Sequence, residues 1–238
     1  MNEARVSAVD RMKTGARGAT RAALDPVVGL LARLGVQPDH VTWTGLVITL
    51  GGGVLFALGH FRYGALVAVV GCVMDVLDGA LARKGGGESR WGAFLDSTTD
   101  RIADAALFLG VAVHYVFAGL ATLRNEDRLT DLLMGPPVAT TIVIDDVMNK
   151  MIFALLALLA MVSALLVSYT RARMEGLGLP CRAGWFERPE RLVVLLGAAL
   201  FGAASPVMPW ALAVLVLLSF FTVFQRVAYA RARLQGPA

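Results

Sequence analysis

The chain has 238 residues, of which 57% are hydrophobic, and its mean hydropathy is +0.66. This composition excludes an ordinary soluble domain, and the length excludes several membrane domains, so we predict a single all-α integral membrane domain. The formal net charge of +4 is modest, and the positions of the basic residues are more informative than their number.

Basic residues lie beside alternate ends of the apolar runs. By the positive-inside rule these clusters face the cytoplasm, so we expect a multi-pass protein of the cell (inner or plasma) membrane with both termini cytoplasmic. The clusters precede the first run, follow the second and the fourth, and close the chain: Arg5, Arg11, Lys13, Arg17, Arg21 and Arg33; Arg83, Lys84 and Arg90; Arg171, Arg173, Arg182, Arg188 and Arg191; Arg226, Arg231 and Arg233.

The N-terminal part divides into a polar tail, residues 1–16, and a juxtamembrane amphipathic segment, residues 17–36. Apolar residues recur there at helical spacing, which predicts a helix lying in the membrane interface. An amphipathic helix packed on the helical bundle is the alternative. Gly35 and Pro38 are expected to end the helix.

The remaining residues, 37–238, are predicted to form one domain of six transmembrane helices. The apolar runs place them at residues 41–59, 63–83, 91–118, 148–173, 192–204 and 210–230. An outer insertion of about residues 119–147 separates the third and fourth helices. Gly135, Pro136 and Pro137 interrupt this segment, so we expect a short outer helix and a partly buried extended piece. The sequence assigns it no function.

Two pairs of carboxylates lie where membrane helices normally carry no charge. Asp75 and Asp78 are spaced i, i+3 near the end of the second helix, and Asp96 and Asp100 are spaced i, i+4 near the start of the third. Each pair occupies one helix face, and both lie at one depth near the cytoplasmic side. Four carboxylates would repel one another unless a cation lay between them. Oxygen ligands without Cys or His favour a hard divalent ion such as Mg²⁺ or Mn²⁺.

Small residues accompany the carboxylates. Gly79, Ala80, Ala82 and Gly92 leave room for a substrate, and Arg83 offers a guanidinium that suits a phosphate group. Together with a divalent ion, these features indicate phosphate chemistry at the membrane surface.

Residues 75–100 match the pattern D-x-x-D-G-x-x-A-R, eight residues, G-x-x-x-D-x-x-x-D at every specified position. This resembles the signature of the CDP-alcohol phosphotransferases. The stretches LDPVVGLLARLGVQPDHVT, DSTTDRIADAALF, SYTRARMEGLGL and FERPERLVVLLGAAL are similar to actinobacterial phosphatidylinositol phosphate synthases, so the resemblance covers most of the chain except residues 119–147.

The resemblance implies a homodimer of six-helix protomers that transfers the phosphatidyl group of CDP-diacylglycerol to inositol 1-phosphate and releases CMP. It implies that the protein also contacts membrane lipids and that it does not bind nucleic acid. It also implies two divalent ions, Mg²⁺ or Mn²⁺, held by Asp75, Asp78, Asp96 and Asp100, with Asp100 as the catalytic base. The implied CDP-lipid positions are Asp39, Thr42, Gly79, Ala82, Arg83, Ser89 and Gly92, and the implied ligands of the acceptor phosphate are Arg171, Arg191 and Arg226.

Several alternatives stay open. The same reaction type could use glycerol 3-phosphate as acceptor or an archaeal-type CDP-lipid as donor, and Arg171 and Arg173 could be ordinary positive-inside residues. Intramembrane carboxylates also occur in cation transporters, although the outer halves of the second and third helices are apolar. Asp104 is expected to form a structural ion pair with Arg101 or another arginine.

Overall fold

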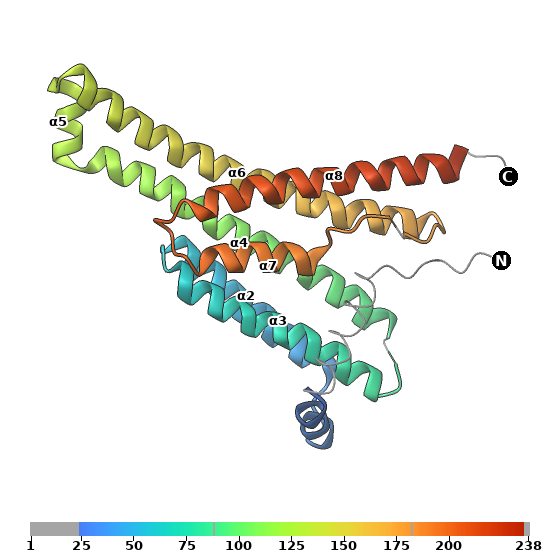
Figure 1. The fold of residues 1–238 in the computed structure, drawn as a ribbon. Coiled ribbons are helices and arrows are strands. Elements are labelled where there is room, and N and C mark those ends of the chain that lie inside the picture. Colours follow the sequence, from blue (N-terminus) through green and yellow to red (C-terminus); the bar gives the residue numbers. More distant parts are fainter. Residues whose placement is uncertain (1–23, 88, 182, 236–238) are drawn as a thin grey trace.

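The computed structural model describes residues 24–87, 89–181 and 183–235, and these residues are helical with no strand (Figure 1). This confirms the predicted all-α class. Residues 24–33 form a first helical segment. The helices that follow are α2 (Pro38–Ala57), α3 (Phe61–Lys84), α4 (Arg90–Arg124), α5 (Glu126–Met134), α6 (Pro137–Gly176), α7 (Arg188–Ala199) and α8 (Val207–Gln235).

The amphipathic segment packs one face on the bundle. Val28 is buried against Val41, Leu77 and Leu81, whereas several other apolar side chains of the segment are exposed. Gly35, with φ +71°, ends the segment, and Pro38 begins α2. The predicted polar tail, residues 1–16, and the start of the predicted helix, residues 17–23, lie outside the described residues.

Five helices of the described chain are long and apolar enough to cross a membrane: α2, α3, α4, α6 and α8. The sixth predicted crossing corresponds to α7, which has 12 residues and spans about 18 Å at ~1.5 Å per residue. A capping box between Glu187 and Glu190 starts α7 at Arg188, four residues earlier than predicted. It also ends earlier, because the chain turns at Gly202, where φ is +91°.

For residues 119–147 the structure contains the predicted short helix, α5, and the prediction of an extended piece was wrong. Pro136 and Pro137 occupy the N-cap and first positions of α6, where proline costs no hydrogen bond, so they begin a helix instead of interrupting one. The 35 residues of α4 and the 40 residues of α6 correspond to about 52 and 60 Å. Both helices therefore extend beyond a hydrocarbon core of ~30 Å, and α5 joins their far ends (Figure 1).

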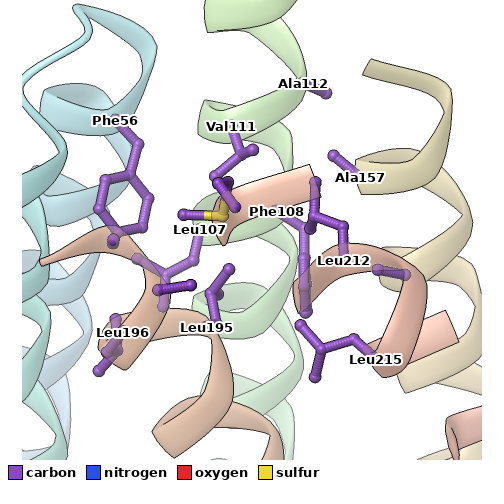
Figure 2. Packing of buried hydrophobic residues seen from close by; sticks show 14 of the residues in the cluster. Phe56, Leu107, Phe108, Val111, Ala112, Ala157, Leu195, Leu196, Leu212 and Leu215 are labelled. Atoms are coloured by element: carbon purple, nitrogen blue, oxygen red, sulfur yellow. The ribbon is translucent and has the colours of Figure 1, made fainter. Parts of the chain in front are cut away.

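The apolar core lies at the middle of the bundle, where α2, α3, α4, α6, α7 and α8 meet. Figure 2 shows its central side chains, which include Phe56, Leu107, Phe108, Val111, Leu195, Leu212 and Leu215. α2 and α4 approach each other closely beside this core. A Cβ added to Gly53 would lie 2.7 Å from the carbonyl oxygen of Ala106, so only glycine fits there.

We expect Gly53→Ala to lower the free energy of unfolding by about 1 to 3 kcal/mol, because the added methyl group meets backbone that cannot rotate away. Unfolding of the purified protein by sodium dodecyl sulfate in mixed micelles measures this change. Gly51→Ala is the matched control, since a Cβ at Gly51 has no neighbour within 4 Å. Equal effects of the two variants would contradict the proposed close contact.

Candidate active site

The carboxylate pairs lie on adjacent helices at one end of the bundle. Asp75 and Asp78 are in the last turns of α3, and Asp96 and Asp100 are in the first turns of α4. α2 packs against both helices and contributes a partner: Thr42 Oγ1 donates to Asp78 Oδ2 at 2.5 Å. Asp78 is only 5% exposed, so this hydrogen bond offsets part of the cost of burying its carboxyl group.

The most connected cation of the site is Arg188, the first residue of α7. Its Nη1 lies 2.8 Å from Asp75 Oδ2 and 2.6 Å from Asp100 Oδ1, and its Nε lies 3.1 Å from Asp104 Oδ1. One guanidinium thus joins carboxylates of α3 and α4. Asp104 also accepts from Arg191 Nη2 at 3.2 Å. The structural ion pair predicted for Asp104 is confirmed, with these two arginines as its partners.

The fit of these residues to a divalent metal depends on donor chemistry and on side-chain positions. The donors are carboxylate oxygens from two neighbouring helices, a set that suits Mg²⁺ or Mn²⁺. Asp75 and Asp100 already share one cationic nitrogen, so their oxygens converge on a common point. Within the described residues, however, no three His, Cys, Asp or Glu side chains form a group that could hold a metal ion. The donor set fits a hard cation, and Arg188 lies where two of the donors meet.

A cavity of about 660 Å³ lies on the α2 and α3 side of the carboxylates. Its lining combines three of the predicted metal ligands with all the predicted CDP-lipid positions: Asp39, Thr42, Asp75, Asp78, Gly79, Ala82, Arg83, Ser89, Gly92 and Asp96. Ser89 Oγ caps α4 by accepting from the Gly92 amide at 2.9 Å. Trp91 Nε1 donates to Asp39 Oδ2 at 3.0 Å and so links the starts of α2 and α4.

A second cavity of about 280 Å³ lies between α4, α6, α7 and α8. It is lined by the three predicted acceptor arginines, Arg171, Arg191 and Arg226, and by Asp96 and Asp100. Since Asp96 lines both cavities, the two spaces meet at the carboxylates.

The three arginines differ in their surroundings. Arg191 is 2% exposed, and its Nε and Nη1 lack a hydrogen-bond partner within the described chain. Arg226, also 2% exposed, donates to the backbone carbonyls of Val167 and Ala183 and lies 3.5 Å from Glu187. Arg171 is half-exposed and pairs with Glu175 at 2.9 Å. Arg191 therefore keeps the most donor capacity for a ligand.

Arg188 is the site residue that the sequence analysis missed. It precedes Arg191 by three residues, so the two lie on one face of α7, and this spacing was the available signal. From the sequence, the positive-inside rule predicts only a cytoplasmic charge at Arg188. Its partners could not be foreseen because they lie 84 to 113 residues away along the chain.

Comparison with known proteins identifies the family of this chain. Residues 36–224 match the family model of the CDP-alcohol phosphatidyltransferases. The chain is 32% identical to the archaetidylinositol phosphate synthase of Methanothermobacter thermautotrophicus, over 92% of this chain and 94% of the relative. It is 34% identical to the phosphatidylinositol phosphate synthase of Streptomyces avermitilis, over 87% and 78% of the two chains.

Solved structures of the phosphatidylinositol phosphate synthase of Mycobacterium tuberculosis are also similar, at 30% identity. The structure with CDP-DAG bound aligns with a TM-score of 0.68 over 87% of this chain and 92% of that chain. The complex with manganese and citrate gives 0.67 over 86% and 87%. Since the family model covers most of the chain, this protein belongs to the CDP-alcohol phosphatidyltransferase family.

Proposed function

We propose that the protein transfers the phosphatidyl group of CDP-diacylglycerol to inositol 1-phosphate, giving phosphatidylinositol phosphate and CMP. The observation that carries this proposal is the pair of cavities that meet at Asp96. The larger one suits a nucleotide with its lipid, and the smaller one, with its arginines, suits a phosphorylated alcohol. A transferase needs both substrates to approach the same reacting groups.

The reaction requires a base at the junction of the cavities. The acceptor hydroxyl attacks the phosphatidyl phosphorus, the bond from that phosphorus to the bridging oxygen breaks, and CMP leaves with the bonding electrons. Asp100, which lines the acceptor cavity, takes the hydroxyl proton. Asp75, Asp78, Asp96 and Asp100 would hold two Mg²⁺ or Mn²⁺ ions. When bound, these ions supply neutralisation of the pyrophosphate charge.

The acceptor phosphate is a dianion and needs cationic partners. Arg191 offers two guanidinium nitrogens, and Arg171 adds a charge on the α6 side of the cavity. Arg226 already bonds to backbone carbonyls, so it also fixes the loop before α7.

The predicted charge distribution puts this end of the bundle at the cytoplasmic face of the cell membrane. We further propose that residues 37–238 form the catalytic domain and that the enzyme is a homodimer.

A second donor is the alternative that a specific observation favours. One relative of 32% identity is an archaetidylinositol phosphate synthase, whose name implies an archaeal-type lipid. Glycerol 3-phosphate is the alternative acceptor, since a cluster of arginines suits the phosphate of any phosphorylated alcohol. Cation transport is less consistent with the structure, because Phe108 and Val111 are buried in an apolar core just beyond Asp104 on α4.

The substrate assignment predicts CMP release only in the presence of inositol 1-phosphate. The purified protein in nanodiscs is supplied with CDP-diacylglycerol and Mg²⁺, and CMP is measured with inositol 1-phosphate, glycerol 3-phosphate or free inositol. Turnover with glycerol 3-phosphate would contradict the assignment of inositol 1-phosphate as acceptor but would leave the reaction type unchanged. Faster turnover with CDP-archaeol than with CDP-diacylglycerol would contradict the assignment of CDP-diacylglycerol as donor.

The role of Asp100 predicts that Asp100→Asn lowers the rate of CMP release by about 10²- to 10⁴-fold, since an amide cannot accept the proton. Asp145→Asn is the control, because Asp145 is exposed on the distant half of α6. A thermal melt of each variant checks folding. An Asp100→Asn enzyme with more than about a tenth of the normal rate would rule out this base.

The acceptor cavity predicts different behaviour of two neighbouring arginines on α6. Arg171 lines the cavity and Arg173 does not, although both are exposed. We expect Arg171→Gln to raise the KM for inositol 1-phosphate about tenfold, the value of one charge-assisted hydrogen bond, and Arg173→Gln to leave it unchanged. Initial rates at varied inositol 1-phosphate measure both. Equal KM values would show that Arg171 is only a positive-inside residue.

A further inference from the structure

The backbone fixes Arg188 firmly. Glu187 is the N-cap of α7, and the side chains of Glu187 and Glu190 bond to each other's backbone amides. Pro189 follows at a position where the helix needs no amide hydrogen. Arg188 therefore starts from a rigid helix end and reaches with its side chain toward α3 and α4. Any change in its ion pairs must come from side-chain rotation.

The guanidinium divides its contacts between two kinds of carboxylate. Nη1 contacts Asp75 and Asp100, which we propose as metal ligands, whereas Nε contacts Asp104, which lies outside that set. Asp104 is buried and also holds Arg191. Rotation can therefore free Asp75 and Asp100 while Nε stays on Asp104.

A divalent ion and Nη1 need the same oxygen atoms. Asp75 Oδ2 and Asp100 Oδ1 are the atoms that Nη1 contacts, at 2.8 and 2.6 Å. A divalent ion held by these two carboxylates would use the same oxygens, because Mg²⁺ takes oxygen ligands at about 2.0 to 2.1 Å. The positively charged nitrogen cannot remain at that point beside the ion, because like charges repel strongly in a site of low dielectric constant.

We propose that Arg188 is the resident counter-cation of the carboxylate cluster, and that divalent cations displace its Nη1 from Asp75 and Asp100. With no metal bound, the arginine prevents repulsion between the carboxylates of α3 and α4 and keeps the helices in register. When metal enters, Arg188 turns toward the acceptor cavity that it also lines. This inference rests on the metal ligands of the proposed function, and Arg188 acts as a positioning residue for them.

The proposal is tested by Mn²⁺ binding to the full-length protein in micelles without substrates. The electron paramagnetic resonance signal of free Mn²⁺ gives the dissociation constant. We expect Arg188→Gln to bind Mn²⁺ about tenfold more tightly, because the ion no longer competes with a charge-assisted hydrogen bond. Arg188→Lys should lie between, since an ammonium keeps the charge and loses the planar fork. Arg171→Gln is the matched control: it removes one charge from the same cavity, and Arg171 pairs with Glu175 instead.

A second readout needs no metal. In EDTA, Arg188→Gln should unfold at a lower temperature than the unaltered protein, and saturating Mn²⁺ should remove the difference. If Arg188→Gln does not fold, the same comparison of unfolding temperatures is made with Arg188→Lys, which keeps a positive charge at this position.

The outcomes separate the two proposals. Unchanged Mn²⁺ affinity in both Arg188 variants, or an equal gain in affinity in Arg171→Gln, would show that Arg188 is not the counter-cation. Either result would leave the proposed metal ligands unaffected. Absence of Mn²⁺ binding in every variant would overturn the proposed metal ligands and, with them, the displacement of Arg188.

Discussion

Carboxylates in an apolar bundle are the constraint on which the site end of this structure depends. Buried charges are costly unless each finds a partner. Asp78 accepts a hydrogen bond from the hydroxyl group of Thr42 on α2. Asp75 and Asp100 share the guanidinium of Arg188 on α7, and Asp104 pairs with both Arg188 and Arg191. Because every partner comes from another helix, pairing the charges also fixes how α2, α3, α4 and α7 meet.

The middle of the bundle works by packing instead. Its core is almost wholly apolar (Figure 2). α2 and α4 also approach each other closely at Gly53. The four carboxylates of the two pairs and their arginine partners lie at one end of the bundle, where both cavities open between helices. A lipid donor can enter such a site from the side of the bilayer and a soluble acceptor from the water, which suits transfer between a CDP-lipid and a phosphorylated alcohol.

Much of this was readable from the sequence, since helical periodicity alone places Asp75 with Asp78 and Asp96 with Asp100. The resemblance then named residues that the structure gathers around two cavities. The errors have physical causes. Pro136 and Pro137 read as breaks because sequence does not show whether a proline starts or interrupts a helix, and α7 was misplaced because its start depends on a capping box. Arg188 was missed because its spacing with Arg191 indicates only a shared helix face and not the carboxylates, 84 to 113 residues away, with which it pairs.

The choice of arginine at position 188 follows from the shape of the site. Three carboxylates surround it, and a guanidinium presents Nη1 and Nε in a fixed fork that contacts two sides at once. An ammonium has a single nitrogen, so it lacks the two separate donor atoms with which Arg188 contacts Asp75 and Asp100 on one side and Asp104 on the other. The fork also makes partial release feasible, because one arm can leave while the other keeps its hydrogen bond. The Arg188 guanidinium can therefore be exchanged for a divalent ion in steps. Throughout that exchange a positive charge remains near the buried carboxylates of α3 and α4.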